Sequence, residues 1–196
     1  MAFFVVMNKS ANPSVRSSWL PPLRLVFLMW LFFAIETFFL VDLGFLGIYP
    51  RNTEGLIGLL TAPLIHGNLN HLLSNTFPLL FLGGVLYMFY NQVANQVFLQ
   101  CYLITNFFVW LLARPFYHIG ASGVVYALAA FLIAIGLFRK DFKSLFIAVA
   151  IIFLYGGLIY GVLPGNQGIS WESHLFGAIV GVGSAWGIFK SYQKRN

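Results

Sequence analysis

The scarcity of charged residues among long apolar runs limits how this chain can fold more than any other feature. Of its 196 residues, 60% are hydrophobic and only 8% are charged, whereas soluble domains carry about 25% charged residues. So few charges cannot cover the surface of a water-soluble domain. A transmembrane helix needs about 20 apolar residues, so the apolar residues suffice for about six such helices. We therefore predict an all-α polytopic membrane protein with six transmembrane helices.

Turn signals and charges divide the chain into these six spans. The expected spans are 25–46, 71–90, 93–112, 122–138, 145–163 and 171–189. A connector rich in glycine and proline, 47–64, separates the first two spans. The expected domain organisation is a short cytoplasmic tail over 1–22, a six-helix membrane domain over 23–190 and a basic cytoplasmic tail over 191–196. A single cysteine, Cys101, excludes an intrachain disulfide.

The basic residues predict the orientation of the spans. With six spans both termini lie on one side of the membrane, and that side holds nine of the eleven Lys and Arg residues. These nine are Lys9, Arg16, Arg24, Arg139, Lys140, Lys143, Lys190, Lys194 and Arg195. Because basic loops stay in the cytoplasm, we expect both termini to be cytoplasmic. The net charge of +6 is then a property of cytoplasmic loops, and no nucleic-acid partner is expected.

Polar residues recur where three spans begin, although polar groups inside lipid are costly. The second, fourth and sixth spans all run from the outer to the inner face in this topology. Their first residues therefore share one depth, near the outer face. The polar residues at these starts are His66, His71, Asn75, Ser122 and His174.

Ser122 lies in the sequence Gly120-Ala121-Ser122-Gly123, directly before an apolar helix. One interpretation is a serine that caps this helix. The other is a nucleophile at a helix N-terminus, where free backbone N–H groups stabilise an oxyanion. Val124 stands where the soluble hydrolase elbow has a second glycine, so that motif is absent.

His174 favours the nucleophile because its helix presents a face with almost no side chains. Gly177 and Gly181 follow His174 at helical spacing, and small residues allow a second helix to approach closely. If this face meets small residues of the fourth span, His174 comes within hydrogen-bond reach of Ser122 and can act as its general base. Alternatively, the glycines serve packing alone.

No acid completes a triad, so a Ser–His dyad is expected. Glu172 is two residues from His174 and faces away from it on a helix. Tyr126 lies one turn after Ser122 and either stacks on His174 or is an ordinary core aromatic. His71 and Asn75 share a helix face and can donate to an oxyanion, although a metal site built from the histidines is an alternative. His118 falls in a loop, where we expect it to be solvated.

Three motifs in this order resemble those of the rhomboid family of intramembrane serine proteases. They are His66-x4-His71-x3-Asn75, Gly120-Ala121-Ser122-Gly123 with Tyr126, and His174-x2-Gly177-x3-Gly181. The resemblance covers about residues 20–190, so the chain is similar to a minimal, core-only member. One departure lies in the connector, where many members have a Trp-Arg pair and this chain reads Leu-Ile-Gly-Leu over 56–59. The fold of the connector and its lipid contacts are therefore open at this point.

The resemblance implies a six-helix core with Ser122 as nucleophile and His174 as general base, without a metal or another cofactor. It assigns oxyanion binding or support of the site to His71, Asn75, His66, Gly120, Gly123 and Tyr126, and helix packing to Gly177 and Gly181.

The expected function is that of a serine endopeptidase in a membrane, most simply the bacterial cytoplasmic (inner) membrane. It would cleave single-span transmembrane proteins near the outer face through an acyl-enzyme, with lipid as its other partner. The alternatives are a non-catalytic rhomboid-like protein that binds transmembrane helices and a small transporter that uses the histidines. Neither alternative needs a nucleophile paired with a base.

Overall fold

The computed structural model of the chain describes residues 19–164 and 170–194. These residues are helical or in loops, and their one β-type pairing is an isolated antiparallel bridge between Ile48 and His118. The predicted all-α fold class is therefore confirmed. Residues 1–18 of the expected tail over 1–22, residues 165–169 of an expected turn over 164–170 and residues 195–196 of the basic tail lie outside the described residues.

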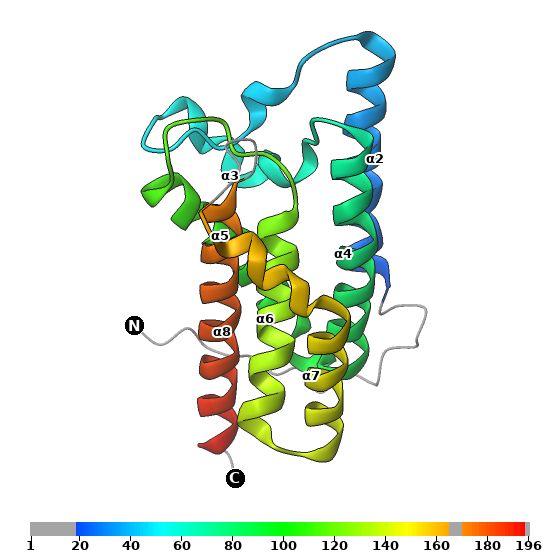
Figure 1. Cartoon of the computed structure of the whole chain (residues 1–196), viewed down its shortest axis with the longest axis vertical. Helices are drawn as coiled ribbons and strands as arrows, with labels where there is room; N and C mark the ends of the chain where they lie inside the picture. Colours follow the sequence, from blue (N-terminus) through cyan, green and yellow to red (C-terminus); the bar gives the residue numbers. More distant parts are fainter. Residues whose placement is uncertain (1–18, 165–169, 195–196) are drawn as a thin grey trace.

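Six long helices form the body of the molecule (Figure 1). They are α2 (Leu20–Phe39), α4 (Leu69–Phe89), α5 (Asn91–Leu112), α6 (Ser122–Arg139), α7 (Phe142–Tyr155) and α8 (Trp171–Gln193). Short helices fill the connector between α2 and α4, namely η1 (Gly44–Leu46), η2 (Glu54–Leu56), α3 (Gly58–Thr61) and η3 (Ala62–Leu64). A 3-10 helix, η4 (Gly156–Val162), continues α7.

Five of the described helical segments are long and apolar enough to cross a membrane. They are α2, α4, α5, α6 and the continuous segment of α7 and η4, Phe142–Val162. Helix α8 has 23 residues, but it carries Glu172, His174 and Lys190 and is less apolar than the other five. The chain is thus a polytopic membrane protein, and the sixth span stays a prediction.

The prediction that the first span continues to residue 46 is wrong. Helix α2 ends at Phe39, and Leu40 adopts a left-handed conformation with φ of 53°. Beyond it, the Asp42 carboxylate accepts a 2.7 Å hydrogen bond from the Gly44 amide. A side chain that bonds its own backbone in this way competes with helix formation.

The predicted fifth span, 145–163, corresponds to the apolar segment Phe142–Val162, although this segment is not α-helical throughout. The α-helix ends at Tyr155, and the chain then forms the 3-10 helix η4. Gly156 and Gly157 lie at this change, and glycine lowers the stability of a regular helix by about 1 kcal/mol relative to alanine. The change matters because η4 carries Gly161 to the polar side chains described below.

Helix α6 is the centre of the bundle and packs against α8, α7, α4 and α5. Leu128, Phe131 and Leu132 on α6 have no exposed surface. The outer surface of the bundle is apolar instead, and large side chains such as Phe38, Phe153 and Ile179 are exposed. Exposed apolar area of this extent indicates contact with lipid rather than water.

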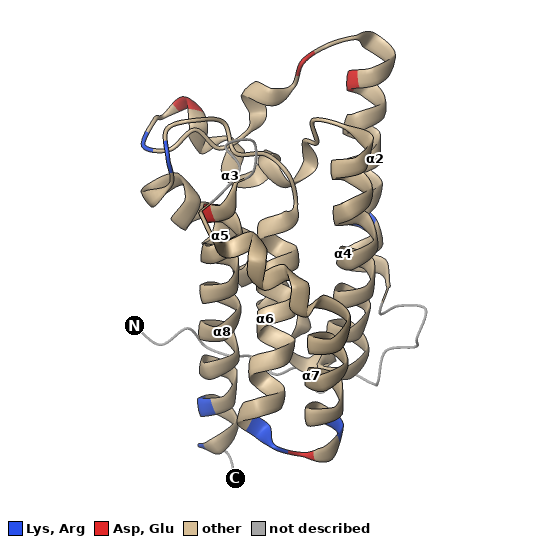
Figure 2. Cartoon of the chain, viewed as in Figure 1, with Lys and Arg blue, Asp and Glu red and all other residues tan. Residues whose placement is uncertain are grey.

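Charged residues lie mainly at the two ends of the bundle (Figure 2). Basic segments lie where α6 turns into α7 and at the end of α8, whereas most acidic segments lie near the other end (Figure 2). Helices α4, α6 and α8 all begin near that second end (Figure 1). The three helices that carry the predicted polar residues therefore begin near the same end of the bundle.

Candidate active site

A cavity of about 490 Å³ opens where α4, α6 and α8 begin. Ser122, His174, His71, Asn75 and Tyr126 all line it. The structure therefore brings together residues from three helices that are far apart in the sequence.

Ser122 is the first residue of α6 and its side chain is paired with that of His174. The distance from Ser122 Oγ to His174 Nε2 is 2.8 Å. Just before the serine, Gly120 adopts a φ of 101°, a conformation that side chains disfavour, and its amide donates a 2.8 Å hydrogen bond to the Ala62 carbonyl. This turn directs Ser122 toward α8.

A backbone carbonyl holds the imidazole of His174. The distance from His174 Nδ1 to the Gly161 carbonyl oxygen is 2.8 Å. Because a carbonyl oxygen can only accept, Nδ1 carries the proton and Nε2 is left as the acceptor facing Ser122. Tyr126 stacks on the ring, with centroids 4.1 Å apart and planes inclined by 2°. The imidazole thus has the tautomer and the orientation of a general base.

His71 and Asn75 lie on α4 across the cavity. The His71 ring is so close to the Gly120 backbone that a Cβ at Gly120 would lie 2.6 Å from His71 Nε2. Asn75 is buried, and its Nδ2 donates a 2.8 Å hydrogen bond to the His71 carbonyl oxygen. A second N–H of this amide is then available to the cavity.

His66 lies beneath His71 rather than in the cavity. It is 1% exposed, and its ring meets the His71 ring edge to face at 4.9 Å. Its Nδ1 is 3.3 Å from the Leu64 carbonyl oxygen, and Nε2 has no hydrogen-bond partner among the described residues. Within those residues no three His, Cys, Asp or Glu side chains lie close enough together to hold a metal ion.

The predicted glycine face of α8 meets α6. A Cβ at Gly177 would clash with the Gly123 carbonyl oxygen and lie 3.3 Å from the Ala127 amide nitrogen. A Cβ at Gly181 would lie 2.9 Å from the Phe131 amide nitrogen. The backbones of the two helices are therefore in direct contact just beyond the Ser122–His174 pair.

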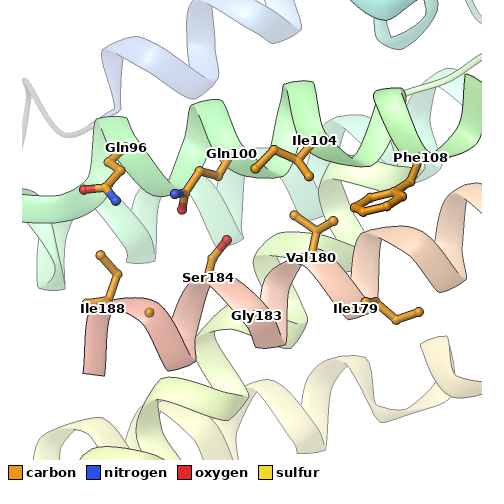
Figure 3. A pocket seen from close by; sticks show the side chains of 10 residues that line it. Gln96, Gln100, Ile104, Phe108, Ile179, Val180, Gly183, Ser184 and Ile188 are labelled. Atoms are coloured by element: carbon orange, nitrogen blue, oxygen red, sulfur yellow. The ribbon is translucent and has the colours of Figure 1, made fainter. Parts of the chain in front are cut away.

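A second pair of glycines on α8 faces open space. Cβ atoms at Gly183 and Gly187 would meet nothing within 4 Å. Both glycines line a groove of about 330 Å³ between α5 and α8, where Gln100 and Ser184 point toward one another (Figure 3). The same helix thus offers tightly packed and unpacked glycines for comparison.

The prediction that His118 is solvated is wrong. His118 is 2% exposed, its Nδ1 is 2.6 Å from Ser170 Oγ, and its Nε2 is 2.9 Å from the Arg114 carbonyl oxygen. A lone histidine in a polar loop gives no signal of these long-range contacts. Glu172 does point away from His174, as predicted, and forms an ion pair with Arg114.

Sequence reasoning also missed Gly161, which holds His174 through its main chain. Any residue type could supply that carbonyl, so no side-chain pattern marks it. The connector is likewise anchored to α5 through main-chain oxygens, since Asn106 donates to the Leu59 carbonyl and Trp110 donates to the Asn52 carbonyl, each at 2.9 Å. These contacts hold the connector against α5 in a chain that lacks the Trp-Arg pair.

The chain is similar to a known family and to several known proteins. A model of the Rhomboid domain matches residues 53–191. The Mycobacterium tuberculosis "Uncharacterized protein Rv1337" is 36% identical over 149 residues, 71% of this chain and 62% of that protein. The Mycobacterium leprae "Uncharacterized protein ML1171" is also 36% identical over 149 residues, 71% of this chain and 59% of that protein.

A more distant relative is the "Putative rhomboid protein L523" of Acanthamoeba polyphaga mimivirus. It is 27% identical over 152 residues, 69% of this chain and 77% of that protein. The chain spans about three fifths of the length of the mycobacterial relatives that it matches.

Proposed function

Because the chain belongs to the rhomboid family, we propose that it is an intramembrane serine endopeptidase with Ser122 as nucleophile and His174 as general base. The observation that carries this proposal is the 2.8 Å contact between Ser122 Oγ and His174 Nε2. The Gly161 carbonyl supports it, because a proton held on Nδ1 leaves Nε2 able to accept the serine proton.

The proposed reaction begins when Ser122 Oγ attacks the scissile carbonyl carbon and its proton moves to His174 Nε2. The C–N bond of the tetrahedral intermediate then breaks, and Nε2 gives that proton to the leaving amine. The product is an acyl-enzyme on Ser122. Water attacks this ester, Nε2 takes the proton of the water, and the proton returns to Ser122 as the new carboxyl group leaves.

The oxyanion of each tetrahedral intermediate needs preorganised donors. Asn75 and His71 line the same cavity as Ser122, and Ser122 itself begins α6, where backbone N–H groups point out of the helix. We assign oxyanion binding to Asn75, His71 and the Ser122 backbone. Gly120, Gly123, Tyr126 and His66 support the site.

The proposed substrates are single-span transmembrane proteins cut near the outer face of the membrane. The cavity lies at one end of the bundle and opposite the basic loop between α6 and α7. If α8 is the sixth span, both termini are cytoplasmic and the cavity lies near the outer face. A bacterial cytoplasmic membrane is the proposed location.

Covalent labelling tests this function without knowledge of the substrate. A serine hydroxyl reacts with a fluorophosphonate only when an adjacent base takes its proton. We expect the purified protein in detergent to be labelled at Ser122, as located by mass spectrometry of its peptides. Ser122→Ala and His174→Ala should each abolish the label, while both variants keep the helical circular dichroism of the wild type.

Equal labelling of the His174→Ala variant, or no labelling of folded wild type after long incubation, would contradict the dyad. A helix-binding protein without catalysis would then explain the fold better. Cleavage of a single-span test substrate by wild type, and not by Ser122→Ala, would establish the endopeptidase directly.

A further inference from the structure

A group of polar residues outside the proposed dyad joins the loop before Ser122 to the first turn of α8. The loop, 113–121, contributes Arg114 and His118, and the start of α8 contributes Ser170, Glu172 and Ser173. Ser122 follows directly on the loop, and His174 follows directly on Ser173. The two segments that carry the dyad are therefore tied to each other by side chains.

The ion pair between Arg114 and Glu172 is bidentate. Arg114 Nε donates to Glu172 Oε1, and Arg114 Nη2 donates to Oε2 over 3.1 Å. The Glu172 side chain is 4% exposed and the Arg114 side chain is 38% exposed. A buried carboxylate needs such a partner, because an unpaired charge there is strongly destabilising. The ion pair also fixes the orientation of the two side chains relative to each other, because two parallel hydrogen bonds allow little rotation.

His118 forms the second tie, and its hydrogen bonds have a definite direction. Nε2 faces the Arg114 carbonyl oxygen at 2.9 Å, so Nε2 must donate. Nδ1 therefore accepts the proton of Ser170 Oγ, 2.6 Å away. Ser170 Oγ is in turn 2.6 Å from Ser173 Oγ, which donates to it. Burial lowers the pKa of His118, which keeps the ring neutral at pH 7.

His118 also connects this group to the connector. Its backbone exchanges two 2.9 Å hydrogen bonds with Ile48, one in each direction. The ring is thus held in place by its own backbone, by the Arg114 carbonyl and by Ser170. Because Ser170 is the residue that caps α8 and accepts from the Ser173 amide, His118 fixes the start of the helix that carries His174.

We propose that Arg114 and His118 are positioning residues, which hold the first turn of α8 so that His174 Nε2 stays in line with Ser122 Oγ. This role rests on the proposed function. The glycine contacts of α8 set its distance from α6. The Arg114 and His118 contacts set the rotation of the start of α8 about the helix axis and its position along that axis. A misplacement of about 1 Å at reacting groups lowers rates by about 100-fold, so both constraints matter for proton transfer.

The test measures how fast a fluorophosphonate reacts once bound, kinact, separately from its binding constant, KI. Loss of positioning slows the covalent step and leaves binding of the probe unchanged. We expect Arg114→Gln and His118→Phe to lower kinact by about 10-fold or more with KI within twofold of wild type. Thermal unfolding of each variant, followed by circular dichroism, shows that the labelled protein is folded at the assay temperature.

Conservative variants separate positioning from general destabilisation. In His118→Asn the amide oxygen stands near the place of Nδ1 and can accept the Ser170 proton, so kinact should recover relative to His118→Phe. In Arg114→Lys one charged donor remains, and kinact should lie between those of wild type and Arg114→Gln. The matched control is Arg139→Gln, which breaks a 3.0 Å ion pair with Asp141 at the opposite end of α6 and should leave kinact unchanged.

Wild-type kinact in both Arg114→Gln and His118→Phe would overturn the positioning role while Ser122 labelling still supports the proposed function. A rise in KI with unchanged kinact would also overturn it, because the residues would then act on access to the cavity. If His118→Phe does not fold, Arg114→Gln alone carries the test, and wild-type kinact in that variant overturns the positioning role. An unlabelled wild type overturns the proposed function and this role with it.

Discussion

The contact between Gly177 and α6 makes a single added methyl group a sensitive probe of the proposed site. A Cβ at Gly177 would lie 3.1 Å from the Gly123 carbonyl carbon and closer still to its oxygen. Ordinary contacts between carbon atoms are about 3.5–4.0 Å. The opposing atoms are backbone and cannot rotate away. The carbon contact alone requires Gly177→Ala to move α8 from α6 by about 0.4–0.9 Å, and the shorter contact with the oxygen raises this displacement to about 1 Å.

This displacement is large compared with the tolerance of the Ser122–His174 hydrogen bond. The present Oγ–Nε2 distance is 2.8 Å, and a separation of 3.6 Å is no longer a hydrogen bond. A movement of about 1 Å exceeds that limit, so the serine loses its base. General base catalysis contributes about 100- to 10,000-fold, and we expect Gly177→Ala to lose at least 100-fold in the labelling rate of Ser122.

The same substitution at Gly183 is the matched control. Gly183 lies on the same helix (Figure 3), and its Cβ would meet nothing within 4 Å. Alanine stabilises a helix by about 1 kcal/mol relative to glycine. Gly183→Ala should therefore label at the wild-type rate and unfold at the same temperature or a higher one. Gly177→Val should be at least as inactive as Gly177→Ala, because it adds two further methyl groups.

The measurement is the rate of fluorophosphonate labelling of the three variants and wild type in the same detergent, beside thermal unfolding. Wild-type labelling of folded Gly177→Ala would refute the reasoning, because the dyad would then tolerate separation of the helices. Equal losses in Gly177→Ala and Gly183→Ala would refute it as well, since the effect would follow from loss of glycine and not from the contact with α6.

Three further predictions concern residues around the dyad. Gly161→Ala should abolish labelling of Ser122, because the new Cβ would clash with the Tyr126 hydroxyl and lie 3.1 Å from His174 Nδ1. Asn75→Ala should lower kcat on a single-span test substrate by about 10-fold or more with little change in KM, since an oxyanion donor acts mainly in the transition state; an unchanged kcat would remove Asn75 from the site. Burial lowers the pKa of His66 from 6.5 to about 4, so the unfolded chain takes up a proton between these pH values that the folded protein does not. Stability should therefore fall as the pH drops from about 6.5 to 4, by up to about 3 kcal/mol. His66→Gln should show a smaller fall in thermal unfolding scans; an equal fall would contradict the assignment to this histidine.

The helices, and the contact between those that carry Ser122 and His174, could be predicted from the sequence because both depend on residue type. The apolar runs are separated by turns and charges, and the polar residues at three helix starts share one depth only in one topology. The glycines after His174 indicated a helix contact, since few other reasons exist for such a bare face. These inferences use the period of the helix and the cost of polar groups in lipid, which a single sequence contains.

Backbone conformation could not be predicted in the same way. Leu40 ends α2 in a left-handed conformation, and leucine is not a residue that marks a helix end. Gly161 acts through its carbonyl oxygen, which all residues have. His118 looks like any loop histidine until Ser170, 52 positions away, is placed beside it. Long-range polar contacts depend on the packed structure, so the residues proposed to position His174 could not be identified from the sequence.

The use of a carbonyl in place of a carboxylate beside His174 follows from where the pair lies. A carboxylate buried among apolar helices needs a cationic partner or is strongly destabilising. Glu172, the acid closest to His174 in sequence, has such a partner in Arg114 and is directed away. The neutral Gly161 carbonyl fixes the imidazole tautomer, but it would stabilise the imidazolium of the proposed proton transfer less than an aspartate does. In the proposed reaction, the orientation of His174 must then supply what electrostatic stabilisation does not. The Tyr126 stack, the glycine contacts and the polar contacts at the start of α8 all constrain that orientation.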